Sequence, residues 1–114
     1  MATLNRSNEI ILRQGDEIAQ QITPKDGKGD TITIASQTIT GLTFKAYKYW
    51  DDTAEAFSIA SVVQSVATDT YITVTPAKTE TLGVEAITYI YVLSGTVNGK
   101  EMTLVRDQIT IEET

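Results

Sequence analysis

The chain of 114 residues contains no cysteine and no histidine. Without cysteine it has no disulfide, no thiolate nucleophile and no thiolate-ligated metal site. Without histidine it lacks the side chain whose unperturbed pKa lies nearest neutrality, which is also the commonest general base and metal ligand. Most enzyme templates are therefore excluded, and the stability of the fold must come from packing and strand pairing.

Basic residues are also scarce, because 9 Lys and Arg stand against 15 Asp and Glu, for a net charge of −6. Phosphate contacts usually need Lys or Arg, so this balance argues against a nucleic-acid partner. No segment approaches the roughly 18 to 20 apolar residues of a membrane span, which argues against a membrane partner. The opening residues MATLNRSNE lack the apolar stretch of a signal peptide. We therefore expect synthesis in a cytoplasm.

Threonine, valine, isoleucine and tyrosine are abundant instead, and these residues pack well on a pleated, half-buried surface. Hydrophobic residues make up 41% of the chain and charged residues 21%, a balance typical of a globular domain. A chain of this length hides roughly 60 to 70% of its unfolded surface in one core. We expect a flexible N-terminal arm at residues 1–8 and a single β-sandwich domain at residues 9–114.

Asn98-Gly99 is the strongest local signal in the chain. An alternating run, 86–97, leads into this dipeptide, and a second run, 100–111, leads out of it. Both central residues of a two-residue hairpin turn need positive φ, which Asn tolerates and Gly adopts freely. The first run is apolar on both faces, which predicts a strand in the middle of a sheet.

The second strand of this hairpin contains a change of parity. Met102 and Leu104 share one face, whereas Ile109 and Ile111 fall on the other. Because side chains alternate with a period of two, one extra residue must lie between the pairs if both point inward. We predict a β-bulge near Arg106-Asp107.

Further segments are predicted as strands from their alternation or β-branched content: 9–13, 17–23 with Ile18 and Ile22 inward, 31–35, 43–50, 54–66 and 69–76. The segment 54–66 also suits a short helix. Turns are predicted at 14–16 and 24–30, and a crossover with one helical turn at 76–82. About seven or eight short strands without a long helix predict an all-β fold, an antiparallel β-sandwich.

Acidic clusters are the first candidates for a site. Asp51-Asp52 with Glu55 offers carboxylate oxygens of the kind that calcium binds, and the segment 26–30 is a second candidate. Adjacent acids at a strand end usually form a solvated turn, and Lys28 would repel an ion from the second segment. Paired carboxylates that hydrolyse glycosides need a groove, which a sandwich of this size has little room to form. We expect no catalytic, cofactor or metal site.

Aromatic residues are the stronger candidates. Tyr47, Tyr49 and Trp50 are predicted on the outward face of the strand 43–50. Outward aromatics can anchor an interface, form a carbohydrate platform or cover a second core layer. Tyr89 and Tyr91 carry the same alternatives, and one of them can instead tie the crossover loop through its hydroxyl. These five residues form the candidate interaction surface.

Short motifs follow one another in a suggestive order: Gln14-Gly15-Asp16, Lys25-Asp26-Gly27, 40–45 (TGLTFK), 74–79 (VTPAKT), 89–92 (YIYV), Asn98-Gly99-Lys100 and 108–111 (QITI). The series resembles the small immunoglobulin-like sandwich domains of tailed-bacteriophage and prophage structural proteins, including the N-terminal domains of siphophage baseplate upper proteins. It spans residues 9–111. Asp107 departs from the pattern, since those proteins often have Gly before the last strand.

This resemblance implies an immunoglobulin-like antiparallel β-sandwich with a structural role. The chain would be a non-enzymatic virion protein that docks on tail, baseplate or capsid proteins and forms a homo-oligomer. Its location would be the virion, after synthesis in the cytoplasm of the bacterial host. The alternative class is a binding module in which Tyr47, Tyr49 and Trp50 recognise a glycan or another cell-surface ligand. An enzyme accessory domain is a third alternative.

Overall fold

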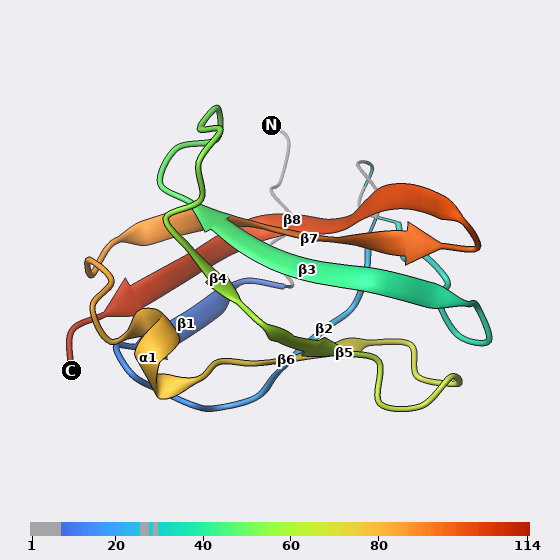
Figure 1. Ribbon diagram of the computed structural model, residues 1–114, viewed down its shortest axis with the longest axis horizontal. Helices are drawn as coiled ribbons and strands as arrows, with labels where there is room; N and C mark the ends of the chain where they lie inside the picture. Colours follow the sequence, from blue (N-terminus) through green and yellow to red (C-terminus); the bar gives the residue numbers. More distant parts are fainter. Residues whose placement is uncertain (1–7, 26–27, 29) are drawn as a thin grey trace.

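The computed structural model describes residues 8–25, 28 and 30–114 (Figure 1). Its elements are β1 (Ile10–Arg13), β2 (Gln20–Ile22), β3 (Ile39–Tyr47), β4 (Phe57–Ile59), β5 (Ser61–Val63), β6 (Ile72–Thr75), α1 (Lys78–Thr81), β7 (Thr88–Val97) and β8 (Lys100–Glu112). A five-stranded sheet has the order β1-β8-β7-β3-β4, and a three-stranded sheet has the order β2-β6-β5. No helix among the described residues is long and apolar enough to cross a membrane.

The strand order is that of an immunoglobulin-like sandwich. In such folds, whose strands are lettered A to G, strands B, E and D lie in one sheet and strands C, F and G lie in the other. Here β2, β6 and β5 correspond to B, E and D, and β3, β7 and β8 at the centre of the second sheet correspond to C, F and G. Neighbouring strands are antiparallel apart from β1 and β8, which pair in parallel. The predicted all-β sandwich is confirmed, as is the central position of β7.

The core lies between the two sheets and follows the alternation of the strands. Tyr89, Tyr91 and Leu93 of β7 point inward and are buried, and Phe44 of β3 lies beside them. The rings of Phe44 and Tyr91 stack with their centroids 4.6 Å apart. Burial of one large apolar side chain stabilises a fold by roughly 1.5–3 kcal/mol, so this core is the main source of stability.

The predicted hairpin at Asn98-Gly99 is confirmed. Asn98 has φ 52° and Gly99 has φ 82°, and β7 and β8 pair from Val97 and Lys100 onward. These positive φ angles match the right-handed twist of the flanking strands.

The Asn98 side chain also ties the turn to the chain before β3. Its Oδ1 accepts a hydrogen bond of 3.2 Å from the Thr38 amide, and its Nδ2 donates to Oε1 of Gln37. The Asn98 amide donates to the carbonyl of Thr38 over 2.9 Å. One residue therefore sets the turn and fixes a neighbouring loop.

The bulge in β8 exists but lies earlier than predicted. Leu93 pairs with Val105 and Ser94 pairs with Thr103, so Leu104 is the extra residue. Leu104 and Val105 are both buried. Val105 already shares the inward parity of Ile109, so the change of parity must precede it. The predicted position at Arg106-Asp107 is therefore wrong.

Two further strand predictions need correction. The segment 31–35 forms no strand, although Ile34 is buried, because its backbone closes loop contacts with Pro24 and Gln37 instead of a ladder. The segment 17–23 contributes only β2, and Ile18 is 62% exposed because it precedes the first residue paired with β6. Alternation alone indicates neither the loop hydrogen bonds of 31–35 nor the residue at which β2 begins to pair with β6.

The segment 54–66 is a strand as predicted, but it is split between the sheets. β4 pairs with β3, and β5 pairs with β6, with Ala60 alone between them. The chain thus crosses from one sheet to the other along one flank of the sandwich. The one helical turn expected in the crossover is present as α1.

Asn8 was expected in a flexible arm, of which residues 1–7 lie outside the described residues. It is instead buried, and its Nδ2 donates a hydrogen bond of 2.7 Å to the carbonyl of Thr23. Its Oδ1 accepts a bond of 3.1 Å from the Thr23 amide. Asn8 therefore belongs to the sandwich. Residues 26, 27 and 29 of the predicted loop 24–30 also lie outside the described residues.

Candidate functional site

The outward surface of the five-stranded sheet has an apolar centre on β7. Ile90 and Val92 alternate with the core residues of β7 and point away from the three-stranded sheet, yet both are half-buried. Ile90 lies between Tyr47 on β3 and Gln108 on β8. Cross-strand neighbours at such spacing lie in contact, so these longer side chains cover Ile90.

Val92 lies in the adjacent row, between Lys45 on β3 and Arg106 on β8. Both flanking side chains are exposed and basic. Long basic side chains lay their methylene stems along apolar surface and keep the charge in water. We call the six residues of these two rows the outer face: Lys45, Tyr47, Ile90, Val92, Arg106 and Gln108.

The loop between β3 and β4, residues 48–56, stands out from the sheet on the side away from the three-stranded sheet (Figure 1). Its Tyr49 is 60% exposed and its Trp50 is 71% exposed. Asp52 closes a turn within the loop, since its Oδ2 accepts a hydrogen bond of 3.1 Å from the Tyr49 amide. Arg106 donates from Nη2 to the carbonyl of Trp50 over 3.0 Å, which fastens the loop to the outer face.

Lys48 marks the base of this loop. Its Nζ lies 3.2 Å from Oε2 of Glu85 and 6.0 Å from the centre of the Tyr49 ring. The hydrogen bond and the charge of Glu85 raise the pKa of Lys48. Both partners are exposed, so the ion pair adds little stability but restrains the loop relative to the start of β7.

The sequence-predicted site residues separate into two groups. Tyr47 lies on the outer face, whereas β3 ends at Tyr47, so Tyr49 and Trp50 lie in the loop and not on the strand. Tyr89 and Tyr91 are 3% and 0% exposed, so their assignment to an interaction surface is wrong.

The reason is that β7 is apolar on both faces, and the face with the larger rings fills the core. Phe57 packs edge-on against Tyr89, with ring centroids 5.2 Å apart. Ile90 and Val92 occupy the outward face instead, and neither is among the residues predicted for the interaction surface. Their alternation with Tyr89 and Tyr91 places them on the opposite face of the strand, but alternation does not show which of the two faces points outward.

Tyr89 has the role considered for one of the two tyrosines. Its hydroxyl donates a hydrogen bond of 2.7 Å to the carbonyl of Glu85, four residues earlier. A tyrosine near the start of strand F, which is β7 here, bonded to the backbone just upstream, is the tyrosine corner of immunoglobulin-like folds. Burial, reinforced by the charge of Glu85, raises the pKa of Tyr89.

A hollow of about 520 Å³ lies beside the outer face, toward the Asn98-Gly99 turn. Half of the residues that line it carry a hydroxyl: Thr43, Ser94, Thr96 and Thr103. Thr43 Oγ1 and Ser94 Oγ are hydrogen-bonded to each other at 2.9 Å. In the described part of the chain, no group of three or more carboxylates is placed to hold a metal ion.

No protein-family model matches the chain, and neither does any curated protein compared with it. Among solved structures, the solution structure of the PKD domain from KIAA 1837 protein is similar, with a TM-score of 0.40 and 14% sequence identity. That match covers 96% of this chain and 84% of the PKD domain chain. The fold assignment made above rests on the strand order and pairing of the chain itself.

Proposed function

We propose that this chain is a non-enzymatic structural protein of a tailed-phage or prophage virion, a docking or assembly module of the tail, baseplate or capsid. The observation that carries the proposal is the exposed pair Tyr49 and Trp50, on a loop that Arg106 of the outer face holds through the Trp50 carbonyl. Tyr and Trp are the residues most enriched among interface anchors. Two large aromatics exposed side by side are typical of a surface that meets a partner.

The motifs that resemble phage sandwich domains support the same proposal. The motif 40–45 lies on β3, 89–92 lies on β7 and 108–111 lies on β8. Asn98-Gly99-Lys100 forms the turn and first residue of the terminal hairpin. These motifs therefore lie on the sheet that carries the outer face, whereas Gln14-Gly15-Asp16 lies in the turn after β1 and 74–79 runs from β6 into α1.

The test is the composition of phage particles. Particles purified after induction of the bacterial strain that carries the gene should contain the chain as a stoichiometric component, detected by mass spectrometry and immunogold labelling. Deletion of the gene should leave particles that lack part of the tail, baseplate or capsid, and complementation in trans should restore them. Intact particles from the deletion strain, together with absence of the chain from wild-type particles, would contradict the proposal.

A second candidate function is glycan binding. It is favoured by the 71% exposure of Trp50 and by the hydroxyl-lined hollow beside the outer face, because sugars combine an apolar ring face with hydroxyl groups. A glycan array probed with the native chain and with Trp50→Ala distinguishes the two candidates. Binding that Trp50→Ala abolishes supports the glycan module, whereas an array without signal rules it out in favour of protein docking.

A further inference from the structure

The loop 48–56 and the outer face carry opposite and complementary chemistry. The loop combines the exposed aromatics Tyr49 and Trp50 with the acids Asp51, Asp52 and Glu55. The outer face combines half-buried apolar side chains with two exposed basic ones, and its members are defined above. Each half therefore offers what the other lacks.

The complementary side chains of the two halves do not pair within the described part of one chain. Trp50 is 71% exposed, so its ring does not cover Ile90 or Val92. Among the described residues, neither Lys45 nor Arg106 has a carboxylate within ion-pair distance, and Arg106 bonds only to the neutral carbonyl of Trp50. The complementary groups are thus free to meet between two molecules.

We infer that two copies of this chain associate through this surface, with the loop 48–56 of each copy lying on the outer face of the other. The inference rests on the assembly function proposed above. A two-fold contact of this kind is self-complementary, so every contact forms twice. Trp50 would bury its ring against the partner's Ile90 and Val92, while Asp51 would face the partner's Lys45.

Charge restricts where the two-fold axis can lie. An axis through Val92 would bring Lys45 against the partner's Arg106, and like charges in contact oppose association. An axis between the loop tip and the basic pair instead brings acid against base on both sides. The acidic loop of the second copy then neutralises Lys45 and Arg106, which have no carboxylate partner in the described part of the first copy.

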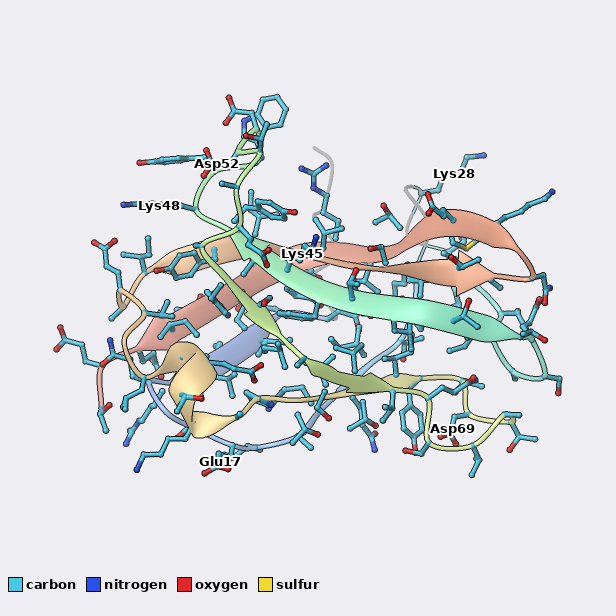
Figure 2. All side chains as sticks on the ribbon, viewed as in Figure 1. Glu17, Lys28, Lys45, Lys48, Asp52 and Asp69 are labelled. Carbon is cyan, nitrogen blue, oxygen red and sulfur yellow. The ribbon has the colours of Figure 1, made fainter. Side chains whose placement is uncertain are left out.

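The rest of the charge distribution is compatible with this arrangement. Lys45 and Lys48 lie on the side of the molecule that bears the loop, whereas Glu17 and Asp69 lie on the opposite side (Figure 2). The net charge of −6 per copy opposes self-association in general. Acids placed away from the contact weaken that repulsion, because exposed charges are screened beyond roughly 8 Å at physiological salt.

Sedimentation equilibrium of the full chain tests the apolar part of the contact. We expect a concentration-dependent dimer, which Trp50→Ser weakens on the order of tenfold to a hundredfold in dissociation constant. The matched control is Ile18→Ser, which removes a side chain that is 62% exposed and lies next to Glu17, away from the loop. It should leave the dimer unchanged. Equal effects of the two substitutions, with both variants folded by circular dichroism, overturn the inference.

A charge exchange tests the polar part. Lys45→Glu places acid opposite the acidic loop, and the double variant Asp51→Lys with Glu55→Lys places base opposite Lys45. Asp52 is left intact because it closes the turn within the loop. Each variant alone should be monomeric, whereas their mixture should form a heterodimer, since both contacts are then again between opposite charges.

The outcomes separate this inference from the proposed function. Heterodimer formation from two monomeric variants supports the surface and its register. A native chain that stays monomeric at high concentration, or charge variants that dimerise as the native chain does, overturns the inference. Neither of these results touches the proposed virion role, which the composition of purified particles decides independently.

Discussion

The hydroxyl of Tyr91 donates a hydrogen bond of 2.6 Å to the backbone carbonyl of Asn8, 83 residues earlier in the chain. Tyr91 lies at the centre of the five-stranded sheet, and Asn8 lies two residues before the start of β1. The Asn8 side chain in turn exchanges two hydrogen bonds with the backbone of Thr23, just after β2. Through Asn8, three strands that come from both sheets are fixed relative to one another.

We predict that Tyr91→Phe lowers the free energy of unfolding by about 1–3 kcal/mol, because it leaves the Asn8 carbonyl without its donor in a buried position. Chemical denaturation of the two proteins measures this difference. Tyr47→Phe is the control, since it removes a hydroxyl from the half-buried ring on the outer face. That substitution should change stability by no more than about 0.5 kcal/mol. Equal losses in the two variants would show that the buried bond contributes nothing specific.

The same tyrosine predicts a dependence on alkaline pH. Burial, together with the charge of Asp107, raises the pKa of Tyr91 well above its ordinary value of 10.0. Below the ordinary pKa both the folded and unfolded chains keep this proton, so the stability does not change there. Above it the unfolded chain loses the proton first, and stability falls by up to about 1.4 kcal/mol per pH unit from this group.

Denaturation curves collected at rising pH measure this slope. In Tyr91→Phe the free energy of unfolding should decline less steeply above the ordinary tyrosine pKa, by up to about 1.4 kcal/mol per pH unit. Tyr89, whose pKa is also raised, still contributes to the decline in that variant. A variant whose stability declines as steeply as that of the native chain would contradict the assignment to Tyr91.

Features that depend on neighbouring residues were predictable from the sequence. The Asn98-Gly99 turn needs only two residues that accept positive φ between alternating runs, and it forms where predicted. The change of parity between Leu104 and Ile109 predicts a bulge in β8 but not its place, because alternation alone does not show that Val105 points inward. Alternation fixes which side chains share a face, and the rest of the fold decides which face is buried.

Features that depend on distant contacts were not predictable. Nothing in 54–66 indicates that the chain changes sheets at Ala60, because β4 and β5 are each defined by a different partner strand. The candidate site shows the same limit. Tyr49 and Trp50 are predicted on the outward face of a strand, but β3 ends at Tyr47, and the bond from Arg106 to the Trp50 carbonyl holds their loop to the outer face.

Asn98 combines a conformational and a bonding role, and two substitutions separate them. Asn98→Gly keeps the positive φ without strain but loses the side-chain bonds to Thr38 and Gln37. Asn98→Ala loses those bonds and also leaves an alanine in a left-handed conformation, which Asn tolerates better and which costs roughly 1–2 kcal/mol relative to Gly. We therefore expect the thermal unfolding midpoint to fall in the order native, Asn98→Gly, Asn98→Ala. Identical midpoints for the two variants would mean that the turn tolerates a side chain at this φ without strain.

Glu80 connects α1 to the point where the chain changes sheets. Its Oε1 accepts a hydrogen bond of 2.6 Å from the Ala77 amide at the start of the helix, and its Oε2 accepts one of 2.8 Å from the Ala60 amide. Glu80→Gln keeps a single acceptor oxygen, so one of these two amides must lose its partner. We expect a loss of roughly 1–3 kcal/mol in stability, since hydrogen bonds to charged groups are stronger than neutral ones.

Amide hydrogen exchange locates the effect of Glu80→Gln, which should accelerate exchange at Ala60 or Ala77 while the amides of β7 change only in proportion to global stability. Glu85→Gln is the matched control, because its carboxylate pairs with Lys48 on the exposed rim, where ion pairs contribute little to stability. If both amides exchange as slowly in Glu80→Gln as in the native chain, the bonds to Glu80 do not hold the β4–β5 junction, and packing of α1 alone must do so.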